Sequence, residues 1–176
     1  QMTASTNSDY CAMSGYLKNC YLVFNSGYSE DSLYCAFLER GKECLDLYVA
    51  DLCERCYDSS NIFKDYNVRY SKRCNECMNV SFSYNLQNCS DCFGCANLKN
   101  KQYYIFNTPY SREEYEASMR KFDHGSYFFV EEMKKKIFEM MLKYPRRYAE
   151  GLNNENVSGD YIFNSKNASY CCEVTD

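Results

Sequence analysis

Four cysteines near the middle of the chain have the spacing of a structural zinc site. Cys53 and Cys56 form one C-x-x-C pair, and Cys74 and Cys77 form a second pair after 17 intervening residues. A four-cysteine zinc site holds its thiolates in a tetrahedron at about 2.3 Å. The spacing therefore makes these four residues candidate metal ligands, with zinc as the candidate cofactor.

The same cysteines also fall into columns that argue against a metal. When the sequence is cut into rows of 18 from Leu17, the first column reads Leu17, Cys35, Cys53, Ser71 and Cys89. Zinc cannot accept a leucine, whereas a buried slot for a small apolar side chain accepts cysteine, because free cysteine behaves as a small hydrophobe. We therefore expect stacked free thiols and commit to no cofactor, with the zinc site as the alternative.

Nucleophilic catalysis by a thiol needs a neighbouring base, and the chain has a single histidine, His124. It follows Asp123 in a glycine-containing turn, and we interpret it as a solvated loop residue. The sequence has no phosphate loop, no His-Glu-x-x-His and no G-x-S-x-G. We assign no catalytic residue. Converging carboxylates in a deep pocket, or a cysteine beside His124, would favour an enzyme.

Three tyrosines share one position of the 18-residue rows: Tyr48, Tyr66 and Tyr84. If they stack, they make an aromatic strip that packs under another element or binds sugars, peptides or bases. We treat them as a candidate binding strip.

The elements that must position these residues follow from the repeat. Columns of small apolar, Asn and Tyr residues predict a mainly β fold, a β-solenoid with coils of about 18 residues stacked about 4.8 Å apart. A column of asparagines, including Asn61 and Asn79, predicts an amide ladder at left-handed turns.

The repeat ends at Phe106, and a helical hairpin interrupts it. Ser111 and Glu114 form a capping box that starts a helix running to about Phe122, and a second helix runs to about Tyr144. The predicted division of one domain is therefore solenoid coils over 1–106, the inserted hairpin over 107–151 and a resumed, incomplete coil over 152–176.

The segments DCFGCANLKNKQYYIFN (91–107), YSREEYE (110–116) and NNENVSGDYIFNSKN (153–167) carry a resemblance to a known group. They resemble a Cys- and Tyr-rich β-solenoid-like repeat family of uncharacterised proteins from candidate-phylum (Patescibacteria) bacteria, some of which bear a CaiB/BaiF label. The resemblance implies a repeat architecture in a longer protein. It implies no catalytic residue, and nothing in this chain supports CoA-transferase chemistry.

Composition limits the partners and the compartment. The net charge of −4 argues against nucleic acid as a partner without a local basic patch. No run of 18 apolar residues and no signal peptide occurs, so we expect no membrane partner. Thirteen cysteines are an odd number that suits free thiols in a reducing, cytoplasmic compartment. We expect a protein partner, or self-association through the open C-terminal coil.

These inferences favour a non-catalytic structural or binding module within a larger cytoplasmic protein. The alternative is a zinc-stabilised module that binds nucleic acid or protein. An enzyme of unknown class is the third reading.

Overall fold

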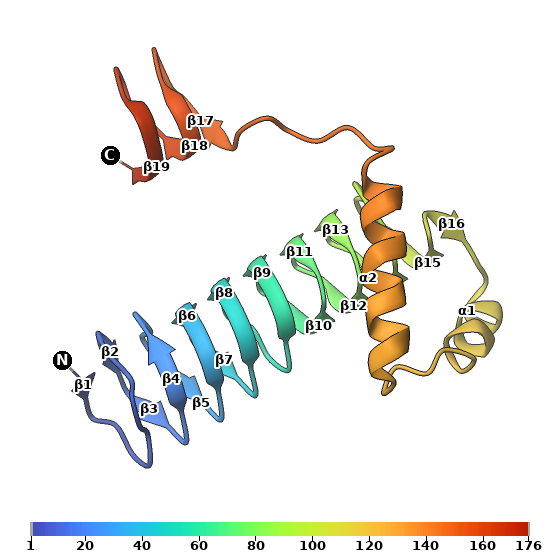
Figure 1. The fold of residues 1–176 in the computed structure, drawn as a ribbon, viewed down its shortest axis with the longest axis horizontal. Helices are drawn as coiled ribbons and strands as arrows, with labels where there is room; N and C mark the ends of the chain where they lie inside the picture. The colour runs from blue at the N-terminus through green and yellow to red at the C-terminus, as the bar shows by residue number, and fades with distance from the viewer. Residues whose placement is uncertain (1, 176) are drawn as a thin grey trace. The chain divides into compact units, whose positions relative to one another are not determined.

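The computed structural model describes residues 2–175, apart from the side chains of residues 2, 3, 173 and 175. The chain is mainly β, with parallel strand pairing and two helices (Figure 1). It divides into two compact units, the first up to Lys143 and the second from Tyr144, and each is described by itself.

A three-residue step builds the coils of the first unit. In one such step, Leu22 has a φ of +53°, Val23 points inward with an exposed fraction of 0% and Phe24 points outward. The left-handed residue turns the chain at a corner, a conformation that Asn adopts more readily than most residues. Four steps complete a coil. In the parallel strand pairs, each residue lies opposite the residue 12 positions later in the sequence, as Val68 lies opposite Val80.

Stacked coils give short parallel strands on successive faces, seen as the ladder that runs from β4 to β15 in Figure 1. The strands of the first unit are β1 (Met2–Thr3), β2 (Ser14–Gly15), β3 (Leu17–Lys18), β4 (Tyr21–Phe24), β5 (Ser29–Glu30), β6 (Leu33–Glu39), β7 (Gly41–Lys42), β8 (Leu45–Asp51), β9 (Tyr57–Phe63), β10 (Tyr66–Arg69), β11 (Lys72–Asn75), β12 (Met78–Ser81), β13 (Tyr84–Gln87), β14 (Ser90–Phe93), β15 (Gln102–Ile105) and β16 (Thr108–Pro109). β16 pairs antiparallel with β15.

The prediction of 18-residue coils is wrong. Paired positions on neighbouring coils are 12 apart in the sequence, so each 18-residue row spans one and a half coils. Because the inward position recurs every third residue, any multiple of three aligns inward residues with inward residues. The 18-residue columns therefore looked uniform while they joined opposite faces of the coil.

Asparagines do form ladders, with partners one 12-residue coil away. The Asn79 amide donates to Asp91 Oδ1 at 3.0 Å and its oxygen accepts from the Asn67 amide at 2.9 Å. Both asparagines have positive φ. Asn61, by contrast, is one and a half coils from Asn79 along the chain and belongs to the opposite face.

Small side chains fill the interior, because each coil places four inward residues around a narrow axis. Eleven cysteines are buried there as free thiols. Inward serines accept backbone N–H groups one coil later; Ser59 Oγ, for example, accepts from Ser71 N at 3.1 Å. Asp65 does the same, accepting from Cys77 N at 2.7 Å, but it is 2% exposed and its Oδ2 has no hydrogen-bond partner.

The two helices follow β16. α1 (Arg112–Met119) begins with the predicted capping box: Ser111 Oγ accepts from the Glu114 N–H, and the Glu114 carboxylate accepts from the Ser111 N–H. α2 (Tyr127–Met141) is the second predicted helix. Both helices are therefore confirmed. They bury a second apolar cluster against the coils, made of Phe82, Phe93, Ile105, Tyr115, Val130, Met133 and Ile137.

The second unit repeats the parallel pairing, with a spacing of 11 residues between its first two strands and of 12 over most of the next pair. Its strands β17 (Gly151–Leu152), β18 (Ser158–Phe163) and β19 (Ser169–Thr175) pair in parallel. Gly151 lies opposite Ile162, one position short of the spacing in the first unit. The division into an interrupted solenoid with boundaries at 106 and 151 stays a prediction. Within residues 2–175 no helix is both long and apolar enough to cross a membrane.

Candidate functional site

A groove of about 710 Å³ runs along one face of the first unit. Two rows of outward side chains form its walls, on either side of the inward positions of the same strands. The corner row, at positive φ, consists of Leu22, Tyr34, Asp46, Asp58 and Tyr70. The strand row consists of Phe24, Ala36, Tyr48, Ser60 and Lys72. The floor between the rows is formed by Cys35, Leu47, Ser59 and Ser71.

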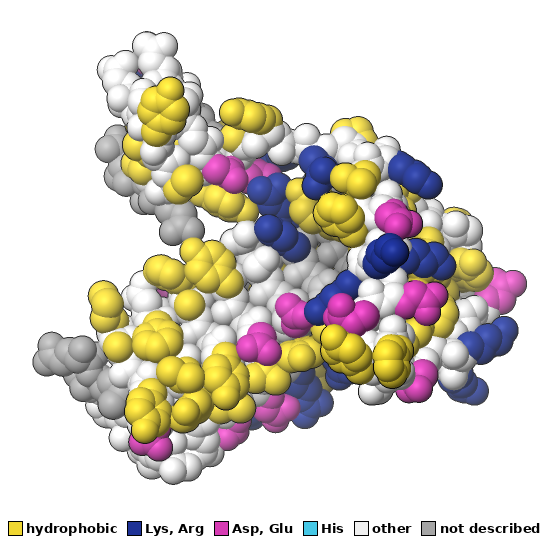
Figure 2. All heavy atoms as spheres, in the orientation of Figure 1, with side chains coloured by type: hydrophobic (Ala, Val, Ile, Leu, Met, Phe, Trp, Pro, Cys, Tyr) yellow, Lys and Arg dark blue, Asp and Glu magenta, His cyan; other side chains and the backbone are white. Residues whose placement is uncertain are grey.

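The groove changes chemically along its length. Aromatic and aliphatic side chains line the N-terminal end, and Figure 2 shows apolar side chains gathered on this part of the surface. Tyr34 and Tyr48 are 51% and 46% exposed, so their ring faces are accessible. Carboxylates line the middle, and Lys72 and Lys134 line the other end.

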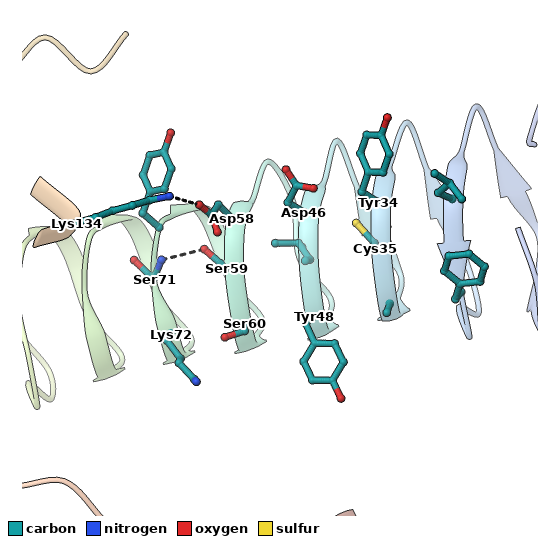
Figure 3. A pocket seen from close by; sticks show the side chains of 15 residues that line it. Tyr34, Cys35, Asp46, Tyr48, Asp58, Ser59, Ser60, Ser71, Lys72 and Lys134 are labelled. Atoms are coloured by element: carbon teal, nitrogen blue, oxygen red, sulfur yellow. Dashed lines mark hydrogen bonds and ion pairs between the residues drawn. The ribbon is translucent and has the colours of Figure 1, made fainter. Parts of the chain in front are cut away.

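Two carboxylates, Asp46 and Asp58, lie next to each other in the corner row. Leu45 pairs with Tyr57 and Leu47 with Ser59, which places Asp46 opposite Asp58 in the parallel register of β8 and β9. Neighbouring strands are about 4.8 Å apart, so the two residues are separated by one strand spacing. Their side chains extend from the same side of the sheet (Figure 3).

Helix α2 supplies a cation to this pair. Lys134 Nζ lies 2.7 Å from Asp58 Oδ2 and 4.9 Å from the ring centroid of Tyr70 (Figure 3). The hydrogen bond to Asp58 raises the pKa of the Lys134 ammonium. Within the part of the chain that the structure describes, Asp46 forms no ion pair. One carboxylate is therefore ion-paired with a lysine, while the other lines the groove without an ion pair.

Packing of α2 on the coils fixes the position of Lys134. Met133 and Ile137, on either side of it along the helix, are each 5% exposed within the second apolar cluster. Gly94 allows this close approach: it has a φ of +64°, and a Cβ there would lie 2.8 Å from Ile137 Cδ1. The hairpin thus contributes directly to the groove.

Cys35 in the floor is not a suitable nucleophile. It is 1% exposed, and burial raises the pKa of its thiol to about 11. Because the thiolate is the reactive form, this group is protonated and inert at neutral pH. The chemistry of the groove rests on its carboxylates and lysines.

The four candidate zinc ligands lie in the interior on different sides of the coil. Cys53 and Cys77 share a column with Asp65 between them, whereas Cys56 and Cys74 occupy two other columns. All four are at most 2% exposed. No cluster of three or more His, Cys, Asp or Glu side chains suited to a metal occurs among the described residues. The prediction of no bound cofactor, with zinc as the alternative, stays a prediction that metal analysis can test.

The three tyrosines of the candidate strip are not brought together. Tyr48 lies in the strand row of the groove, and Tyr84 lies three coils further along the same column, where it is 7% exposed. Tyr66 is half a coil away, and its hydroxyl accepts from Arg55 Nη1 at 3.1 Å. Of the three, Tyr48 lines the groove.

His124 lies in the turn between the helices and is exposed. Its ring is 5.8 to 6.1 Å, between centroids, from the rings of Phe93, Phe122 and Phe129. It lines a second cavity of about 680 Å³, apart from the carboxylate pair.

Sequence reasoning missed Asp46, Asp58 and Lys134. The two aspartates are separated by one coil of the correct length, so a search at that period would have placed them side by side. No sequence signal connects them to Lys134, which reaches the groove through the packing of α2.

Comparisons with known proteins find matches among solved structures alone. No protein-family model and no curated protein matches the chain. A UDP-N-acetylglucosamine O-acyltransferase from Moraxella catarrhalis aligns with 82% of this chain and 88% of its own, at 12% identity and a TM-score of 0.22. A Bacillus cereus protein described as an acetyltransferase aligns with 81% of this chain and 92% of its own, at 11% identity and a TM-score of 0.19.

These comparisons correct the prediction of a non-catalytic module, since these two solved structures are described as transferases. With TM-scores this low, neither likeness assigns an activity or a fold to this chain. The resemblance to the Patescibacterial repeat family and the cytoplasmic location stay predictions.

Proposed function

We propose that the chain is a β-solenoid with 12-residue coils whose groove is the active site of an enzyme that hydrolyses glycosidic bonds in an extended saccharide. The observation that carries the proposal is the pair Asp46 and Asp58, which lie in register on neighbouring strands within one groove. Two neighbouring carboxylates in one groove favour an enzyme over a non-catalytic scaffold.

The shape and lining of the groove suit a sugar chain. Its volume of about 710 Å³ is within the range of about 300–1,000 Å³ typical of small-molecule sites. Tyr34 and Tyr48 present ring faces on opposite walls, and such rings offer an apolar face together with a polar hydroxyl. A saccharide has the matching character, with C–H faces for the rings and hydroxyl groups for the polar walls.

The carboxylate pair suits the chemistry of glycoside hydrolysis. Retaining glycosidases hold two carboxyl groups about 5–5.5 Å apart, and the backbones of Asp46 and Asp58 are one strand spacing of about 4.8 Å apart, from which two side chains can reach that separation. Asp58, which is ion-paired with Lys134, attacks the anomeric carbon as the glycosidic C–O bond breaks. Asp46 gives its proton to the leaving oxygen and then removes a proton from the water that releases the sugar from Asp58.

The test is turnover of a panel of oligosaccharides, measured as the release of reducing ends, together with binding measured by calorimetry. Asp46→Asn should lower kcat by about 100-fold or more, because acid–base catalysis contributes about 10²–10⁴-fold, and should leave binding intact. Asp51→Asn, a change of the same kind at the other end of β8 and outside the groove, is the matched control. Absence of turnover across the panel, or equal turnover by Asp46→Asn and the wild type, would refute the proposal.

A further inference from the structure

Lys72 is a cation that lines the groove and has no carboxylate partner among the described residues. It is exposed at the start of β11 and lines the groove in the strand row. Its register neighbours are Ser60 on one side and Tyr84 on the other. In the described part of the chain no acidic residue forms an ion pair with it.

Three other cations on these coils pair with a carboxylate one coil away, whereas five form no ion pair among the described residues: Arg40, Lys42, Arg69, Lys99 and Lys101. Lys18 pairs with Glu30 in this way. Arg55 Nε lies 2.8 Å from Glu43 Oε2, and Lys64 Nζ lies 3.6 Å from Glu76 Oε1. In each pair the two residues are one coil apart in the sequence, so the coil geometry makes such pairs readily available. At Lys72 the same geometry offers two hydroxyl groups, which leaves its charge directed to the groove.

We infer that the groove takes an anionic saccharide, whose carboxylate binds Lys72. The inference rests on the proposed function for its assignment of the groove to a saccharide. Lys72 lies one coil, about 4.8 Å, beyond the level of Asp58, so the bound carboxylate belongs to a sugar near the bond that is cleaved. Lys134, on the opposite wall at the same end, is compensated by its ion pair with Asp58, so Lys72 is the cation available to the ligand.

The net charge of the chain makes this local arrangement necessary. At −4 the protein as a whole repels an acidic polymer, so capture of one requires a local cation without a carboxylate partner. The groove provides one: its basic end lies beyond the two aspartates, and its other end is apolar. The basic end and the apolar end also set the orientation of the substrate. A saccharide with an acidic sugar at one end binds with that sugar at the basic end.

The experiment compares two probes that share a sugar backbone, one anionic and one neutral: tetragalacturonate and its methyl ester. Wild-type protein should bind the acid about two- to fivefold more tightly than the ester, as expected for one exposed ion pair, and added salt should remove the difference. Lys72→Met should bind both probes equally. Lys99→Met removes an exposed lysine outside the groove and is the matched control.

The outcomes separate this inference from the proposed function. Equal binding of the acid and the ester by the wild type overturns the anionic substrate, and cleavage of the ester would still leave the glycosidase proposal in place. If the wild type prefers the acid, Lys72→Met does not, and neither probe is cleaved, the inference of an anionic ligand is supported. The same result overturns the proposal that the groove hydrolyses glycosidic bonds. A preference that Lys99→Met also abolishes overturns the role of Lys72.

Discussion

Replacement of Asp65 by asparagine should remove most of the pH dependence of folding between pH 4 and pH 8. Burial raises the pKa of this carboxyl from 3.8 to about 8, because desolvation of the charged form outweighs the hydrogen bond from the Cys77 N–H. Oδ2 has no hydrogen-bond partner to stabilise a charge. The folded protein therefore keeps Asp65 protonated across this range, while the unfolded chain ionises it.

The sign and size of the effect follow from this difference. A group whose folded pKa is raised contributes stability that is fully present below its unfolded pKa and is lost as the pH rises through the folded pKa. Each pH unit between those limits costs about 1.4 kcal/mol of unfolding free energy. The wild type should lose on the order of 5 kcal/mol between pH 4 and pH 8 through this residue alone.

The assay is urea unfolding followed by circular dichroism at several pH values. Asp65→Asn keeps the acceptor for the Cys77 N–H, and its unsatisfied amide adds a pH-independent cost of about 1–3 kcal/mol. The slope against pH is therefore the informative quantity. Asp51→Asn controls for loss of a partly exposed carboxylate. Parallel pH profiles for the wild type and Asp65→Asn would refute the argument that a buried, protonated carboxyl lies in the core.

Three further changes probe the ladder, the hairpin and the thiols. Asn79→Ala removes the hydrogen bonds to Asn67 and Asp91 and should cost about 1–3 kcal/mol, whereas Lys135→Ala should stay within about 0.5 kcal/mol; equal urea midpoints would contradict the ladder. Gly94→Ala places a Cβ 2.7 Å from Phe106 Cδ1, so we expect a loss of about 1–3 kcal/mol and faster hydrogen exchange in α2, and unchanged exchange would count against the packing described. Eleven of the 13 thiols are buried, so a thiol reagent should modify two per native chain and all 13 after unfolding, and reaction of more than two in the native protein would contradict this core.

Much of the architecture was predictable from the sequence, and the reason is local chemistry. The capping box at Ser111 and Glu114 depends on neighbouring residues, so the start of α1 could be read directly. The mainly β class and the Asn ladders follow from short-range composition in the same way. The coil length could not be fixed so simply, because a three-residue step makes 12 and 18 equally regular for inward positions.

The groove was beyond sequence reasoning for a related reason. The wrong period separated Asp46 from Asp58 and joined Tyr48 to Tyr66, which lie on different faces. Lys134 comes from a helix 76 residues after Asp58, and its contact depends on how apolar side chains of α2 pack on the coils. Such packing depends on three-dimensional shape, which residue spacing does not reveal.

The three-residue step also determines how such a chain can change length during evolution. Duplication of 36 nucleotides would add one whole coil and leave every downstream residue on its original face. Gain or loss of three residues would keep the thiols inside yet rotate all later side chains by a quarter turn, so that a different set of residues would meet in each groove. A change of one residue needs a bulge to absorb it, such as the register shift at Ser158/Gly159. Short, in-frame duplications could therefore create new combinations of surface residues while the same core is kept.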